Sequence, residues 1–559
     1  MRQSYNRARE CNKLSPIGLS SCGQIACSVV TMNRRTFVRS VVGTAVVAAW
    51  PEILIRSAGA RPADVASRID KSSFRKLADI ALGTAKKLGA GYADIRVCRY
   101  QHQTINTREE RVEGIDESID SGFGVRVLVD GTWGFSSSNT VTEAQVEKVA
   151  RAAVEMARAN KLIQKMLVEL EKLPAYHDDW IMPMKSDPFT VSIEEKVSKL
   201  LAINEAARKG GANFCNSSMS FVKEEKQFAS SYGSLISQSR VRCFPQFHVT
   251  AVDKDSGKFA TRNSLAAPRG SGYEYVREYD WIGEATKASE EARQKLKAKP
   301  VDPGKKDLLI HPTNLWLTIH ESIGHPCELD RALGYEANFA GTSFVTTEKL
   351  DKLRYGSEFI TIVGDRTQKG GLATVAYDDD GVRTKGSEFN IITKGRFTNY
   401  EMAIGQAPKI GRKKSNGCSF ADGWDTFPIQ RMPNISLQPG RKKISIEELA
   451  SDIKDGVYII GNGSWSIDQQ RYNFQFGGQV FYEIKNGKIG QMLREVAYQG
   501  NTVDFWNACD GICGEDEYYL GGAFNCGKGQ PQQIAPVSHG AVPARFRRIN
   551  VLNTERKDI

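Results

Sequence analysis

Two histidines, His320 and His325, flank a glutamate in the sequence His-Glu-Ser-Ile-Gly-His, and their spacing restricts the local backbone. On a regular α-helix, residues five positions apart point about 140° away from each other, so the two rings could not bind one metal ion. A π-type turn of roughly 4.4 residues brings them within about 50°. Gly324 tolerates such a distortion, and Pro326 lacks the N–H that a regular helix requires. The motif therefore predicts a bulged or broken turn at Ile323 to Pro326.

The same six residues contain the parts of a zinc-dependent hydrolytic centre, because two imidazoles lie beside a carboxylate. A catalytic zinc ion takes three protein ligands and leaves one position for water. Cys526, in the sequence Asn-Cys-Gly-Lys-Gly, is the best candidate for the third ligand, since its thiolate would give the metal the same net charge as a carboxylate. His539 and Glu328 are the alternatives, and composition alone does not decide among the three.

The length of the chain and one segment rich in Pro, Gly and Lys predict its domain organisation. The chain has 559 residues, 40% of them apolar, which is sufficient for two or three domains with substantial cores. The clearest boundary is the Pro-, Gly- and Lys-rich segment 299–306. We therefore expect an N-terminal α+β domain over 61–302 and a C-terminal β-rich domain over 303–559.

Hydrophobic periodicity and turn residues give the expected elements of both domains. The N-terminal domain is expected to contain helices at 72–88, 142–159, 192–210 and 281–299, a strand at 92–108, a strand-rich segment at 214–261 and a hairpin at 125–135. The C-terminal domain is expected to contain a short strand at 308–311, a motif helix capped by Thr313, and antiparallel strands at 382–399, 456–460, 478–485 and 488–498. Asp130-Gly131 and Asn486-Gly487 are typical of hairpin turns. The predicted fold class is α+β.

Residues 1–60 are interpreted as a leader. Arg34 and Arg35, followed by Phe37, precede a mildly apolar stretch and the small-residue sequence Ala58-Gly59-Ala60, which is typical of a twin-arginine export signal. Such signals begin a few residues before the arginines, so Met32 is the expected true start. We therefore expect export to the periplasm or another extracytoplasmic compartment.

Charge and hydropathy exclude two classes of partner. Residues 1–60 carry eight Lys and Arg against two Glu, a net charge of +6 out of +11 for the whole chain. The small remainder gives no reason to expect nucleic-acid binding. No uninterrupted apolar run of about 18 residues occurs, so no stable membrane span is expected.

Two other motifs are weaker. The segment Gly522 to Lys528 nearly matches a phosphate-binding loop, but Gly529 replaces the required Ser or Thr and Pro531 disfavours the following helix. Eleven cysteines in a chain of this length do not indicate a disulfide scaffold. Cys509 and Cys513 are close enough in sequence to pair in an oxidising compartment, and the sequence does not decide whether they do.

The His-Glu-Ser-Ile-Gly-His motif, with the late Cys526-Gly-Lys, resembles the TldD branch of the TldD/PmbA family. The similarity extends from about residue 72 to the end, and the sister PmbA branch lacks the motif. Further similar blocks are Gly124-Val-Arg-Val, Trp133-Gly-Phe, Tyr377-Asp-Asp-Asp-Gly381, Arg431-Met-Pro-Asn434 and Gly477-Gly478 through Asn486-Gly-Lys488.

This resemblance implies a zinc-dependent peptidase that hydrolyses unfolded peptides or protein segments. His320, His325 and Cys526 would bind Zn²⁺, and Glu321 would accept a proton from the zinc-bound water and return it to the leaving amine. The resemblance also implies a two-domain architecture and a dimer, formed either with a second copy or with a PmbA-type paralogue. Peptides could bind as an added strand.

The main alternative is a non-catalytic binding or scaffold subunit with a structural zinc. Such a closed site would need a fourth protein ligand, for which Cys513 and His539 are candidates. A fourth position open to water would favour the enzyme. A DNA-associated regulator is disfavoured by the nearly neutral charge of the mature chain.

Overall fold

The computed structural model describes residues 70–529 and 531–555 of the chain. All of them belong to one compact unit, Arg61–Ile559. The expected leader, including Met32, Arg34 and Arg35, lies outside the described residues. Within the described part, no helix is both long and apolar enough to cross a membrane.

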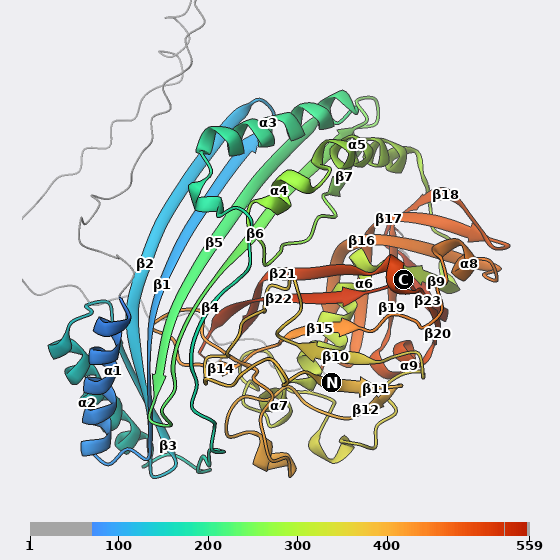
Figure 1. The fold of residues 1–559 in the computed structure, drawn as a ribbon. Coiled ribbons are helices and arrows are strands. Elements are labelled where there is room, and N and C mark those ends of the chain that lie inside the picture. Colours follow the sequence, from blue (N-terminus) through green and yellow to red (C-terminus); the bar gives the residue numbers. More distant parts are fainter. Residues whose placement is uncertain (1–69, 530, 556–559) are drawn as a thin grey trace, which may run out of the picture. The chain divides into compact units, whose positions relative to one another are not determined.

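A seven-stranded sheet forms the N-terminal half of this unit (Figure 1). Its strands follow the order β3-β2-β1-β5-β6-β4, with β7 paired to β6, and only the β4–β6 pairing is parallel. The strands are β1 (Tyr92–Arg108), β2 (Arg111–Val129), β3 (Thr132–Ser138), β4 (His177–Ile181), β5 (Phe214–Ser230), β6 (Leu235–Val252) and β7 (Phe259–Asn263).

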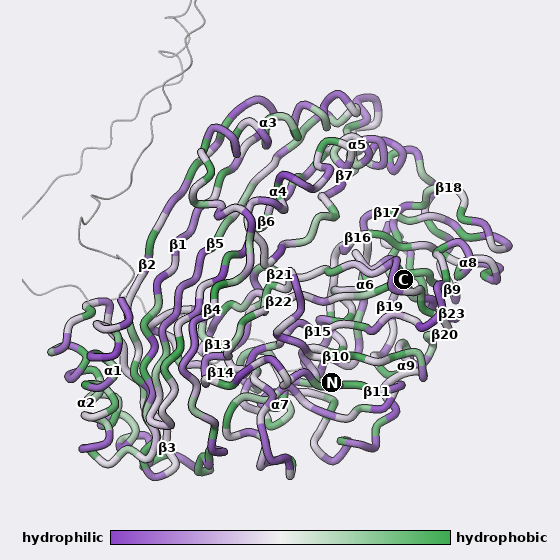
Figure 2. Tube along the Cα trace, viewed as in Figure 1, coloured by the Kyte–Doolittle hydropathy of each residue, from purple (hydrophilic) through white to green (hydrophobic). Residues whose placement is uncertain are grey.

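Helices cover the two ends of this sheet and produce two separate cores. α1 (Lys71–Lys87) and α2 (Glu143–Asn160) pack at the β3 end, whereas α3 (Ile193–Lys209), α4 (Glu274–Glu278) and α5 (Trp281–Lys297) pack at the other end (Figure 1). Between the ends, the long strands carry hydrophobic and hydrophilic residues in close succession (Figure 2). The burial pattern of β2, for example, is mostly exposed in its first half and mostly buried in its second.

The C-terminal half is built around a closed ring of strands. β9 (Gly304–Ile310), β23 (Ala544–Asn553), β19 (Val496–Asn501), β17 (Asn473–Lys485) and β16 (Asp455–Ile467) pair in that order, and β16 pairs back to β9. Helix α6 (Pro312–Ile319) follows β9 directly and contacts β16 and the two-stranded sheet formed by β21 (Tyr519–Lys528) and β22 (Gln533–Ala541). This arrangement places α6 against β21.

The remaining C-terminal elements are short. They are β8 (Lys299–Pro300), α7 (Leu329–Ala332), β10 (Ile362–Asp365), β11 (Phe389–Thr393), β12 (Arg396–Phe397), β13 (Ser419–Phe420), β14 (Ile429–Gln430), β15 (Asn434–Leu437), α8 (Ile446–Ala450), β18 (Lys488–Arg494), α9 (Thr502–Asn507) and β20 (Cys509–Ile512).

The predicted α+β fold class is confirmed, as are the four N-terminal helices and both hairpin turns. Asp130 and Asn486 each have φ 48°, and the glycines that follow them also have positive φ. This is the conformation for which Asp-Gly and Asn-Gly are favoured in two-residue hairpins. The predicted antiparallel character of the C-terminal strands is correct except for the parallel pairs β9–β16 and β8–β18.

Three local predictions were wrong. The motif helix is capped by the side chain of His311, because Pro312 occupies its first position, and Thr313 supplies the N–H that His311 accepts. Strand structure over 382–399 is limited to β11 and β12, since turns around Gly386 (φ 82°) fold the preceding segment. The strand expected at 488–498 is divided into β18 and β19 at Glu495, which has φ 59°.

Candidate metal centre

The motif helix changes its hydrogen-bonding pattern at His320. Helix α6 continues into a π-turn over His320–Gly324 and then a 3-10 turn over His325–Cys327. The N–H of His325 donates to the carbonyl of His320, five residues earlier. The predicted distortion is therefore confirmed, although it begins at His320 rather than at Ile323.

The carbonyl that Pro326 leaves without a helical partner is bonded by another group. In a regular helix, residue 326 would donate its N–H to the carbonyl of Ser322, but proline has none. The hydroxyl of Tyr355 donates to this carbonyl at 2.5 Å, and the indole Nε1 of Trp506 donates to Ser322 Oγ at 2.9 Å. All of these groups are buried, so the contacts hold the turn in its distorted form.

Cys526 reaches the same place from β21 because that strand contains a β-bulge. Ala523 pairs with Val537 and Cys526 with Ala535, so three steps along β21 match two along β22. The bulge puts Cys526 on the same face as Ala523, whereas regular alternation would put them on opposite faces. His539, two residues from Val537, lies on that face too. Both Cys526 and His539 therefore point towards the π-turn, where each contacts His320.

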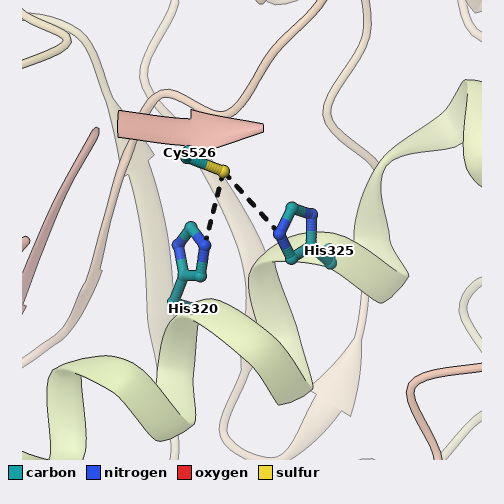
Figure 3. Close-up of side chains that lie close together, drawn as sticks. All are labelled: His320, His325 and Cys526. Carbon is teal, nitrogen blue, oxygen red and sulfur yellow. Dashed lines mark hydrogen bonds between the residues drawn. The ribbon is translucent and has the colours of Figure 1, made fainter. Parts of the chain in front are cut away.

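The three predicted ligands converge (Figure 3). Cys526 Sγ lies 3.4 Å from His320 Nε2 and 3.7 Å from His325 Nε2, and the three potential ligand atoms all lie within 4.8 Å of one another. With bond lengths of roughly 2.3 Å to sulfur and 2.05 Å to nitrogen, a tetrahedral zinc separates its sulfur and nitrogen ligands by about 3.6 Å. The donor set and its sulfur–nitrogen distances thus fit a zinc ion.

Hydrogen bonds to the other ring nitrogens fix which atoms face the centre. His539 Nδ1 lies 3.1 Å from the carbonyl oxygen of Ile435, which can only accept, so His539 Nδ1 carries the proton. Its Nε2 then accepts from His320 Nδ1 at 2.7 Å. The carboxylate of Glu328 likewise accepts from His325 Nδ1 at 3.0 Å. Both motif histidines therefore present an unprotonated Nε2 to Cys526, the form that binds a metal.

Burial favours the uncharged form of each of the three candidate ligands. Burial lowers the pKa of His320 and of His325, so both rings are neutral at pH 7. Burial raises the pKa of the Cys526 thiol to about 11, although the nearby Arg431 guanidinium acts in the opposite direction. A metal that binds here must therefore displace the thiol proton.

A fully buried lysine, Lys528, links strand β21 to the acidic residues that follow the His-Glu-Ser-Ile-Gly-His motif. Lys528, two residues after Cys526, has its Nζ 3.1 Å from Glu328 and 2.8 Å from Asp330. Glu328 is also 3.4 Å from the guanidinium of Arg331. These cations hold the pKa of Glu328 well below its usual range despite its burial. The lysine that resembled part of a phosphate-binding loop thus lies in an ion-pair network beside His325.

Glu321, the predicted base, is buried and forms an ion pair with Arg471. Arg471 lies in the turn between β16 and β17 with φ 63°, a conformation that non-glycine residues seldom adopt. The carboxylate of Asp468 accepts the N–H groups of Tyr472 and Asn473 and so stabilises this turn. Sequence reasoning missed Arg471, because it lies 150 residues from Glu321 and no local motif marks it.

The alternative ligands have other positions. His539 and Glu328 bond the outer nitrogens of the motif rings. Among the described residues, the group placed so that it could hold a metal ion consists of His320, His325 and Cys526. Cys513, considered as a fourth ligand, is a buried free thiol, as is Cys509. A three-ligand site leaves one position of a tetrahedral metal for water or substrate.

Three models of one family match the chain. They describe domain 1, the central domain and the C-terminal domain of PmbA/TldA metallopeptidases, and they match residues 93–157, 186–298 and 303–551. Metalloprotease MJ0996 of Methanocaldococcus jannaschii is 30% identical over 80% of this chain and 94% of its own length. The chain belongs to the PmbA/TldA metallopeptidase family.

Other relatives agree with this assignment. A zinc metalloprotease TldD homolog of Saccharolobus solfataricus is 25% identical over 84% of this chain and 98% of its own. The crystal structure of TldE from Thermococcus kodakarensis shares the fold, with a TM-score of 0.66 at 16% identity, covering 86% of this chain and 99% of that one. PmbA/TldA membership extends over both halves of the described unit.

Proposed function

We propose that this chain is a zinc-dependent peptidase that hydrolyses peptide bonds in unfolded peptides or protein segments. The observation that carries the proposal is the convergence of His320 Nε2, His325 Nε2 and Cys526 Sγ. The buried carboxylate of Glu321, the residue after His320, acts electrostatically on both His320 and Cys526. The names of the metalloprotease relatives, one of them a zinc metalloprotease, support it.

Each residue has a distinct task in this proposal. His320, His325 and Cys526 would hold the zinc ion, which supplies Lewis acidity that acidifies water and polarises a carbonyl group. Glu321 accepts a proton from the attacking water and returns it to the leaving amine. The ion pair with Arg471 holds the Glu321 carboxylate in position.

The test separates metal binding from proton transfer. Glu321→Gln should retain the zinc content of the wild type, measured by atomic emission, and lose peptide turnover by about 10² to 10⁴-fold. Cys526→Ala should lose both zinc and turnover. Glu194→Gln, an exposed change in α3, is the matched control and should alter neither. Full turnover by Glu321→Gln would refute the assignment of the base.

We also propose export by the twin-arginine route, on the strength of Arg34 and Arg35 before an apolar stretch. Because this route carries folded proteins, zinc could be loaded before the Cys526 thiol meets an oxidising compartment. Replacing both arginines by lysine should leave the protein in the cytoplasmic fraction. Unchanged export of that variant would contradict the proposal.

The proposed partner is a second copy of the chain or a PmbA-type paralogue. The likeness of the fold to TldE supports an assembly of this kind. Light scattering of the purified chain, alone and mixed with a paralogue from the same cell, gives the molar mass that tests this proposal. The mass of a monomer under both conditions would exclude both dimers.

A further inference from the structure

Strand β21 presents two buried side chains to the motif turn. Cys526 and Lys528 are two residues apart beyond the bulge, where the pairing with β22 is regular, so both side chains lie on one face of the strand. The thiol of Cys526 points to the two imidazoles (Figure 3). Lys528 is fully buried, and its ammonium group lies among the acidic residues that follow the motif. One strand thus supplies a candidate metal ligand and a cation to the same region.

Four oxygen atoms lie close to the Lys528 ammonium group. Its Nζ is 3.1 Å from Glu328 Oε1, 2.8 Å from Asp330 Oδ1 and 3.4 Å from Glu336 Oε1, and it donates to Gln430 Oε1 as well. A buried ammonium group has three N–H donors that need such partners. The position of Nζ is therefore fixed from several directions.

The two oxygens of Glu328 contact different groups. Oε1 faces Lys528, whereas Oε2 accepts from His325 Nδ1 at 3.0 Å and is 3.4 Å from Arg331 Nε. Arg331 contacts the same oxygen as His325, and Lys528 holds the other one. A carboxylate held at both oxygens cannot turn away from the imidazole.

The partner of His325 needs a nearby cation, unlike the partner of the other motif histidine. His320 Nδ1 donates to His539, which is a neutral ring. Glu328 is a fully buried carboxylate, and a buried charge without a partner of opposite sign is costly. The place of Glu328 beside His325 therefore depends on the cations around it, of which Lys528 is the one carried by the same strand as Cys526.

The geometry points to Lys528 as a positioning residue of the metal centre. Its ammonium group holds the Glu328 carboxylate against the Nδ1–H of His325, so the Nε2 of this ring stays unprotonated and free to bind the metal. The inference rests on the zinc site of the proposed function, not on peptide hydrolysis. A lysine that only fixed the packing of β21 would stabilise the fold and leave the zinc affinity of the folded protein unchanged.

Zinc affinity is measured first, by competition with a chromophoric chelator. Lys528→Met, which removes the charge at similar length, should raise the zinc dissociation constant about tenfold, the lower end of the effect expected for an outer partner of a ligand histidine. Lys226→Met is the matched control. Lys226 is also buried and forms an ion pair with Asp379 at 2.8 Å, so its replacement should lower stability but change the zinc dissociation constant by less than about twofold.

A double-mutant cycle tests whether Lys528 acts through Glu328. Glu328→Gln alone should also raise the zinc dissociation constant about tenfold. Adding Lys528→Met to Glu328→Gln should change it by less than about twofold further, because the lysine no longer has this carboxylate to hold. A combined loss of about 100-fold, the product of two independent effects, would overturn the proposal.

A second measurement needs no metal. The chain has 7 histidines, so nitrogen-15 NMR of the imidazole rings in chelator-treated protein at about pH 8 can identify the tautomer of His325. The wild type and Lys226→Met should show the Nδ1–H form, and Lys528→Met should show a substantial fraction of the Nε2–H form. An unchanged tautomer in folded Lys528→Met protein would contradict the inference.

A second variant guards against a loss of fold. Lys528→Met leaves three buried acids without their shared cation, so Lys528→Met/Asp330→Asn, which removes one acid together with the lysine, is measured beside it and should show the same loss of zinc affinity. If neither variant folds, Lys528 serves the fold rather than His325, and the proposal is wrong.

The outcomes also separate this inference from the function on which it rests. If the zinc measurements come out as expected but no peptide is cleaved, the role of Lys528 stands and the peptidase is wrong. If the wild type binds no zinc, the proposed function fails, and the tautomer of His325 still decides whether Lys528 positions this ring.

Discussion

Replacing His539 by phenylalanine tests whether the outer hydrogen bond of His320 matters for metal binding. Phenylalanine keeps a ring that can stack on Trp316, but it removes the bond of 2.7 Å to His320 Nδ1 and the bond of 3.1 Å to the carbonyl of Ile435. His320 is then free to place its proton on Nε2, the atom that faces Cys526. Zinc affinity should therefore fall.

The magnitude follows from the role of this bond. Loss of an outer partner of a metal-binding histidine weakens affinity by about 10 to 100-fold, which corresponds to roughly 1.4 to 2.7 kcal/mol. Zinc stabilises the folded state by RT ln(1 + [Zn]/Kd), so at a fixed free zinc concentration the variant should lose the same amount of metal-dependent stabilisation. In His539→Gln, the side-chain Oε1 can accept from His320 but cannot also bond the carbonyl oxygen of Ile435. The zinc affinity of this variant should lie between those of the wild type and His539→Phe.

Competition with a chromophoric chelator measures the zinc affinity, and denaturant unfolding with and without zinc measures the stabilisation. The unfolding curve without zinc separates a loss of affinity from a loss of fold. His177→Gln, an exposed change in β4, is the matched control and should bind zinc as the wild type does. A folded His539→Phe protein with zinc affinity within twofold of the wild type would refute the reasoning.

Two further predictions concern packing and pH. Gly521→Ala should lower the free energy of unfolding by about 1 to 3 kcal/mol and weaken zinc binding, because the added Cβ would overlap Trp316. Gly527→Ala, on the same strand but with open space around it, is the control and should change the free energy of unfolding by at most about 0.5 kcal/mol. Equal unfolding midpoints of the two variants would contradict this prediction. Burial lowers the pKa of His311 from 6.5 to about 4, so the unfolded chain takes up a proton first and stability should fall by roughly 3 kcal/mol between pH 6.5 and pH 4. His311→Asn keeps a side-chain acceptor for the helix cap and should remove this part of the pH dependence. The free energy of unfolding of chelator-treated variant and wild type, measured against pH, should therefore diverge increasingly below pH 6.5. Parallel curves would exclude this role of His311.

The local sequence was sufficient where a physical constraint acts over a few residues. The i and i+5 spacing of His320 and His325, with Gly324 and Pro326, predicted the π-turn, because a regular helix cannot bring the two rings together. Asp-Gly and Asn-Gly predicted two hairpin turns, since only a small set of residues adopts positive φ at low cost. The same local reasoning failed at Thr313, where Pro312 moved the cap to His311.

The tertiary structure decided everything that required distant segments to meet. The sequence offered Cys526, His539 and Glu328 as third ligands. The bulge in β21 turned Cys526 towards both imidazoles, and His539 and Glu328 became partners of the outer ring nitrogens. Arg471 had no local signal at all. Periodicity and turn chemistry specify how a segment is shaped, whereas the pairing of strands and the packing of helices on them determine which side chains share one small volume.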